Sequence, residues 1–202
     1  MNPLFWIITI ALLAVAVAAA ILALTMKRPR LIIVAAAALV AAYVSTSLAP
    51  EDVPGWVTVL VALLGLTLAT VGGGSVVDTT LDLATPGQRH GAHGGILLTR
   101  PTPVPPPATG ATGTAPTAPT AIGQPIEVLR GGTTIGVLER IAAAGSIMTG
   151  SAEAIAAVIA IKGLGRFTEL SSPEARERFI IGTLASLLWA SACGTLARIY
   201  LG

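Results

Sequence analysis

The best candidates for chemistry are four charged residues in two apolar stretches of the C-terminal half: Glu139, Arg140, Glu153 and Lys162. Only 11% of the 202 residues are charged, whereas 53% are hydrophobic. A charge inside a membrane-embedded segment is costly, and by default it marks a pathway or a contact with a partner. The four residues therefore form a candidate polar cluster. The alternative is that they anchor helices at the membrane interface, with Glu153 stabilising the start of a helix.

Other residue combinations with known chemistry are incomplete in this sequence. His90 and His93 have the spacing of metal ligands, but no third histidine, cysteine or nearby carboxylate pair completes a site. The Gly163-x-Gly165 pattern lacks the preceding strand and the later glycines of a dinucleotide-binding loop. Cys193 has no histidine near it in the sequence, which is typical of a packed membrane cysteine. We therefore predict no enzymatic activity, no catalytic residue, no metal and no cofactor.

The elements that carry these residues are predicted from the distribution of charge. The mean hydropathy is +0.81, and a helix that spans a bilayer needs roughly 20 mostly apolar residues. Four runs without a charged side chain meet this need: 4–24, 31–50, 53–77 and 179–197. We predict an all-α integral membrane protein with four transmembrane helices in contact with the lipid bilayer. A net charge of +2 and an aromatic content of 4% argue against a nucleic-acid partner.

Basic residues predict the orientation of these helices. Lys27, Arg28 and Arg30 follow the first apolar run, and no basic residue precedes it, which favours a retained anchor over a secretory signal peptide. Because short cytoplasmic loops are rich in Lys and Arg, this turn is expected inside the cell. Both termini of a multi-pass protein of the cell membrane are then outside. Trp6 and Trp56 are expected at the same outer interface.

Composition divides the chain into three regions. We predict a three-helix transmembrane region at 1–77, a flexible cytoplasmic linker at 78–130, and a membrane-embedded helical hairpin with the final transmembrane helix at 131–202. The linker contains most of the chain's 14 prolines among Thr, Ala and Gly. Such a segment buries too little apolar surface to offset the entropy of ordering, so we expect it to be disordered.

Two interpretations of the stretch after the linker stay open. Ile141 to Ile161 is long enough to be one span, but this would place Glu153 inside the membrane and the later basic loop outside. Alternatively, 135–148 and 152–164 form a short hairpin with Ser151 as N-cap, which enters the membrane by about 20 Å without crossing it. The basic loop at 162–178 favours the hairpin. Counting outward from its turn places Glu139 near Lys162, where an ion pair can form.

A stripe of small residues follows one face of the last span: Gly182, Ser186, Ala190 and Gly194. Small residues at this spacing let membrane helices approach closely. The expected partner is either the first span, which has Ala14 and Ala18 at matching spacing, or the same helix of another copy. The alternative is that an Ala-rich helix produces such a stripe by chance.

The C-terminal half also carries motifs that resemble those of a family. The segments LRGGTTIGVLER, AIKGLGRFTEL and ERFIIGT are similar to the C-terminal half of a group of small, uncharacterised membrane proteins of high-GC bacteria. The resemblance covers about 131–194, with 72–83 as a weaker addition. It implies a bacterial membrane protein, and it brings no activity with it.

Two functions are compatible with these features. The first is a non-enzymatic interaction protein, an accessory or scaffold subunit that binds a protein partner or forms a homo-oligomer. The second is a small transporter or channel-like protein with a polar site around Glu153 and Lys162. Four spans with few polar residues form a small bundle, which favours the first function.

Overall fold

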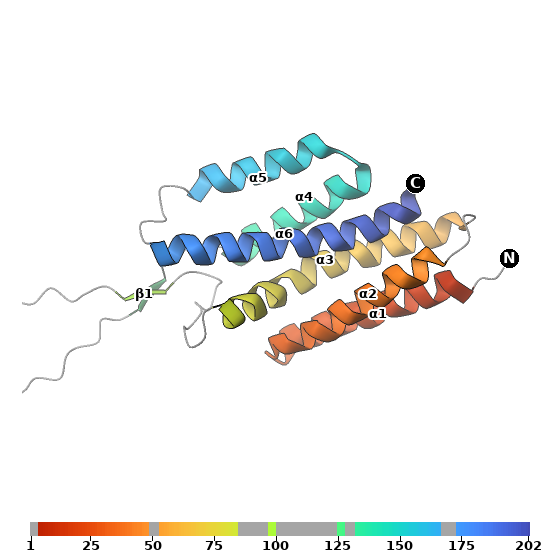
Figure 1. Cartoon of the computed structure of the whole chain (residues 1–202), viewed down its shortest axis with the longest axis horizontal. Coiled ribbons are helices and arrows are strands. Elements are labelled where there is room, and N and C mark those ends of the chain that lie inside the picture. The colour runs from red at the N-terminus through yellow and green to blue at the C-terminus, as the bar shows by residue number, and fades with distance from the viewer. Residues whose placement is uncertain (1–3, 49–52, 85–96, 100–124, 128–131, 167–172) are drawn as a thin grey trace, which may run out of the picture. The chain divides into compact units, whose positions relative to one another are not determined.

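The computed structural model describes residues 4–48, 53–84, 97–99, 125–127, 132–166 and 173–202. This part of the chain contains six α-helices (Figure 1): α1 (Leu4–Thr25), α2 (Ile32–Ser47), α3 (Gly55–Ala84), α4 (Gly132–Thr149), α5 (Ala152–Arg166) and α6 (Pro173–Leu201). Four segments are long and apolar enough to cross a bilayer: Leu4–Thr25, Pro29–Ser47, Gly55–Ala84 and Arg176–Leu201. The four spans predicted from charge-free runs are therefore confirmed as candidate spans, which marks a multi-pass membrane protein.

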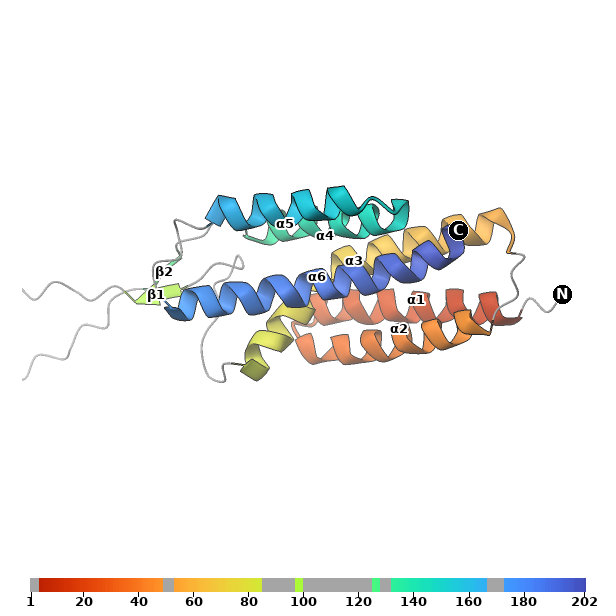
Figure 2. The ribbon, with the colours of Figure 1, turned by 45° about the horizontal axis from the view of Figure 1, so that its top comes forward.

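A tight turn joins α1 to α2, as the position of Pro29 predicts. Lys27 leaves the helical conformation with a φ of 51°, and Pro29 begins a short 3-10 helix, Pro29–Leu31. Proline fits there because the first residues of a helix need no backbone N–H for internal bonding. The two helices then run side by side (Figure 2), and Ser45 Oγ of α2 donates a hydrogen bond to the Phe5 carbonyl oxygen at 2.9 Å.

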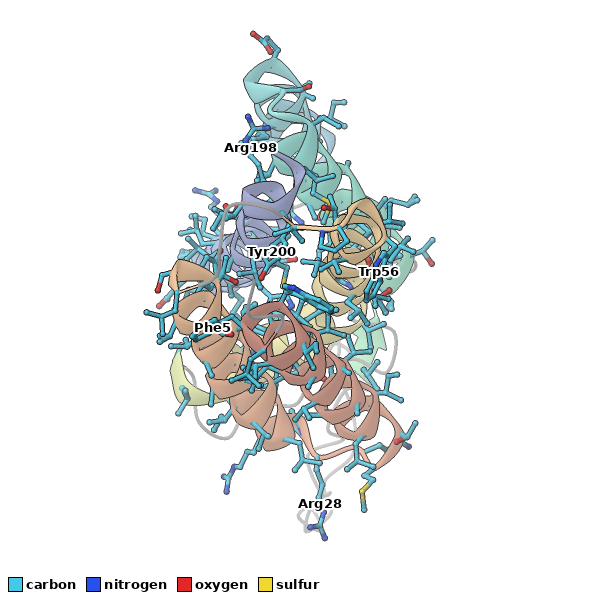
Figure 3. All side chains as sticks on the ribbon, turned by 90° about the vertical axis from the view of Figure 1, so that its right-hand side faces the viewer. Phe5, Arg28, Trp56, Arg198 and Tyr200 are labelled. Carbon is cyan, nitrogen blue, oxygen red and sulfur yellow. The ribbon has the colours of Figure 1, made fainter. Side chains whose placement is uncertain are left out.

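The first turns of α1 and α3 lie at one end of the bundle. The rings of Trp6 and Trp56 meet edge to face, with centroids 5.3 Å apart and an interplanar angle of 89°. The tryptophans therefore share an end, as expected. Figure 3 looks onto this end, where Tyr200 of α6 lies between Phe5 of α1 and Trp56 of α3, whereas Arg28 of the α1–α2 turn, beyond the other end of α1, points away from the bundle.

The C-terminal part of α3 differs from the sequence prediction. The helix continues to Ala84, so 78–84 are helical and do not begin the linker. The six helices confirm the expected all-α fold, to which two short strands are added: β1 (Leu97–Thr99) and β2 (Pro125–Glu127) pair antiparallel with Leu97 opposite Glu127. The remainder of the expected linker lies outside the described residues, as do His90 and His93.

Small residues dominate the interior of the helical unit. Alanines from α1, α2, α3 and α6 are buried, among them Ala16, Ala35, Ala69 and Ala190. Their short side chains bring the helices close together, which matters in lipid because van der Waals contact replaces the hydrophobic drive. Hydrogen bonds across helices reinforce the packing. Tyr43 Oη donates to the Ala192 carbonyl oxygen at 2.6 Å, and Tyr200 Oη donates to Thr9 Oγ1 at 3.1 Å.

Candidate functional site

The candidate site is built on a helical hairpin formed by α4 and α5. Gly150 has a φ of 71°, a left-handed conformation that favours glycine. The Gly150 N–H donates to the Ile147 carbonyl oxygen at 3.0 Å, and the Ser151 N–H donates to that of Ser146 at 2.8 Å. This pattern is a Schellman motif, which ends α4 at Thr149. The two helices and the turn of the hairpin interpretation are therefore present, and no continuous helix runs through 141–161 as the single-span interpretation requires.

The turn of the hairpin lies at the end of the bundle where α6 finishes. Arg198 of α6 covers Gly150, and its Nη1 atom donates long hydrogen bonds of 3.4 and 3.5 Å to the carbonyl oxygens of Ile147 and Met148. With 18 residues, α4 is about 27 Å long. The arm is longer than the expected 20 Å because the helix already begins at Gly132.

Glu139 and Lys162 form an ion pair between the two arms. Their side chains are 12% and 14% exposed, so most of the pair is withdrawn from solvent. Lys162 Nζ also lies 5.8 Å from the ring centroid of Phe179 on α6, within reach of a cation–π interaction. Lys162 therefore links α5 to both α4 and α6, and the pairing expected from the residue count is present.

Arg140 follows Glu139 but points to a different helix. Successive residues of an α-helix are about 100° apart, so Glu139 faces α5 while Arg140 faces α3. Arg140 is 6% exposed, and its Nε donates to the Thr70 carbonyl oxygen at 3.1 Å. Its Cδ rests on Gly73, where any added Cβ would overlap it. The absence of a side chain at Gly73 is therefore what admits the arginine.

Trp189 of α6 uses the adjacent glycine in the same way. Its Nε1 donates to the Leu68 carbonyl oxygen at 3.0 Å, and a Cβ on Gly72 would lie 2.9 Å from the indole ring. Gly72 and Gly73 therefore form a packing surface for α6 and α4. Sequence reasoning missed Trp189 and Thr70, although three consecutive glycines in an apolar helix signal such a close approach.

Glu153 lies apart from the other members of the predicted polar cluster. It is exposed in the first turn of α5, about 13 Å along the helix from Lys162. The structure therefore brings Glu139 and Lys162 together, directs Arg140 to α3 and leaves Glu153 at the far end of the hairpin. Cys193 is buried, as expected for a packed cysteine.

The small-residue stripe of α6 faces the interior. Ser186 and Ala190 are buried, and positions for a Cβ on Gly194 and Gly182 lie 3.0 Å from the Ala144 carbonyl oxygen and 3.3 Å from Val77 Cγ1. These neighbours belong to α4 and α3, so the partners named from the sequence need correction. On α1, the alanines at 14 and 18 are exposed because its buried face runs through Leu13, Ala16 and Ala20.

Among the described residues, no group of three or more His, Cys, Asp or Glu side chains could hold a metal ion. Comparison with family models, with curated proteins and with solved structures finds no match to this chain. The function is therefore inferred from the geometry of helices α3 to α6.

Proposed function

We propose that the chain is a non-enzymatic interaction protein of the cell membrane, an accessory or scaffold subunit of a membrane complex. Both termini lie outside the cell in this proposal, and the linker is cytoplasmic. Lys27, Arg28 and Arg30 support this orientation because they occupy the exposed turn between two candidate spans. We also propose that the chain is a member of the bacterial membrane-protein family that residues 131–194 resemble.

The observation that carries the proposal is the uncovered surface of α5. Among the α5 side chains that the structure describes, none is buried, and Ile159 and Ile161 are 50% and 72% exposed. The half-buried side chains, Ala154, Ile155, Val158 and Lys162, lie on one side of the helix. The opposite side is thus an apolar face without a covering helix from the described part of the chain.

The shape of this face fits a transmembrane helix of a partner protein. Its centre is formed by Ala156 and Ala160, with Gly163 along the same line, and all three are exposed. Ile159 and Ile161 lie on either side of this line at about 100° per residue. Small residues four positions apart, flanked by larger ones, form a shallow groove into which a second helix packs closely. With 15 residues, α5 is too short to span a bilayer alone.

Site-specific photo-cross-linking in native membranes tests this proposal. A photoreactive residue in place of Ile161 should give a discrete protein adduct, whereas the same residue in place of Val40 on α2, which is 64% exposed, should give none. Changing Ala156 and Ala160 to Leu should abolish the Ile161 adduct by filling the groove. Lipid adducts alone, or equal protein adducts from both positions, would contradict the proposal, and an adduct of twice the chain mass would identify a second copy.

A second candidate function is that of a small transporter, and the largely buried Glu139–Lys162 pair is the observation that favours it. Proteoliposomes that contain the chain would then show a saturable solute or ion flux. The flux should be lost in Lys162→Gln and kept in Glu153→Gln, because Glu153 lies away from the pair. A flux equal to that of empty liposomes rejects this candidate.

A further inference from the structure

Arg140 is a buried cation with unmet hydrogen-bonding capacity. A guanidinium carries five N–H donors, and within the described part of the chain Arg140 makes one hydrogen bond, from Nε to the Thr70 carbonyl oxygen. The residue is only 6% exposed, so solvent reaches little of it. Buried donors without partners are costly, and in native structures they indicate a bound water, ion or ligand.

The charges around Arg140 also indicate a bound ion or ligand. The neighbouring carboxylate, Glu139, is engaged by Lys162, which leaves one positive charge uncompensated among these three residues. The guanidinium also lies toward the N-terminus of α4, since Nη1 is 3.1 Å from the position of a Cβ on Gly136, one turn before Arg140. The first turn of α4 contains no acidic side chain to offset the positive end of the helix dipole.

We propose that Arg140 and the N-terminal part of α4 bind a phosphate oxyanion, and that an anionic phospholipid headgroup supplies it. The planar fork of a guanidinium matches the two oxygens of a phosphate. Gly73, against which Arg140 rests, lies about 27 Å along α3 from Gly55, close to the far surface of a bilayer core about 30 Å thick. Lipid phosphates are concentrated at this depth, and basic pockets between helices there bind anionic headgroups.

Thermal unfolding of the purified full chain in neutral detergent tests this site. Phosphatidylglycerol should raise the Tm of delipidated protein in a saturable manner, whereas a glycosyl diacylglycerol with the same acyl chains and no phosphate should not. In Arg140→Gln the apparent affinity for phosphatidylglycerol should fall by about tenfold or more, since a charge-assisted hydrogen bond is lost. If inorganic phosphate alone raises the Tm, the oxyanion site is supported, but its ligand is free phosphate and not a lipid headgroup.

Two controls separate this site from general attraction between charges. Arg28→Gln removes an exposed cation of the α1–α2 turn and should leave the affinity for phosphatidylglycerol unchanged. Gly136→Ala crowds Nη1 while Arg140 remains, so it should weaken binding, whereas Gly145→Ala on the same helix meets nothing within 4 Å and should not. If Arg140→Gln does not fold, the comparison of Gly136→Ala with Gly145→Ala decides whether Arg140 binds the lipid. Equal effects of Arg28→Gln and Arg140→Gln, or of the two glycine substitutions, would overturn the proposal.

Discussion

The consecutive glycines of α3 permit a matched test of how Arg140 holds α4 to the bundle. A Cβ on Gly73 would overlap Arg140 Cδ, whereas a Cβ on Gly74 meets nothing within 4 Å. Both substitutions to Ala remove a glycine from a helix, which by itself stabilises by about 1 kcal/mol. Gly74→Ala should therefore raise the free energy of unfolding slightly. Gly73→Ala should lower it, because the buried arginine must move.

The size of the loss at Gly73 follows from two contributions. Overpacking of a close contact costs about 1–3 kcal/mol, and displacing Arg140 gives up its hydrogen bond to Thr70, worth roughly 1.5–3 kcal/mol for a charged donor. After the gain of about 1 kcal/mol in helix propensity is subtracted, a net loss of about 1.5–5 kcal/mol remains. Unfolding of both variants by SDS in mixed micelles measures the difference. If Gly73→Ala is as stable as Gly74→Ala, Arg140 does not pack against α3 as described.

Three further variants test the other contacts, each by unfolding in mixed micelles. Gly194→Leu should destabilise by about 1–3 kcal/mol because a Cβ there lies 3.0 Å from a carbonyl oxygen of α4, and unchanged stability would show that α6 does not approach α4 at this position. Trp189→Phe should cost about 0.5–1.5 kcal/mol since its Nε1 hydrogen bond to α3 is lost, and unchanged stability would refute that bond. Lys162→Gln should cost about 3 kcal/mol by leaving Glu139 unpaired, and exchanging the two charges should restore much of the loss.

The spans and the hairpin could be predicted because they depend on local properties. Length, charge and hydropathy mark the four candidate spans, and Gly150 marks the turn through its left-handed backbone conformation. The spacing of Glu139 and Lys162 about that turn was sufficient to predict their pairing. Each of these features is determined by residues within a single helix or a single hairpin.

The neighbours of each helix face could not be predicted in the same way. Glu139 and Arg140 are adjacent in the sequence, but their side chains contact α5 and α3, respectively. Which helix each one meets depends on the arrangement of helices in the bundle. The same limit explains why the α6 stripe was expected to contact either the first span or another copy, although Gly194 contacts α4. The contacts of Gly72 and Gly73 could not be predicted either, because their partners, Trp189 and Arg140, are distant in sequence.

In the proposed topology, α4 and α5 return the chain to the side of the membrane from which it entered, and cysteine accessibility tests this directly. In a Cys193→Ala background, single cysteines would replace Ala111, Thr168 and Gly202, and a membrane-impermeant thiol reagent would be applied before and after permeabilisation of cells. Cysteines at 111 and 168 should both react only after permeabilisation, whereas the one at 202 should react in intact cells. Labelling of 111 and 168 from opposite sides of the membrane would contradict the hairpin.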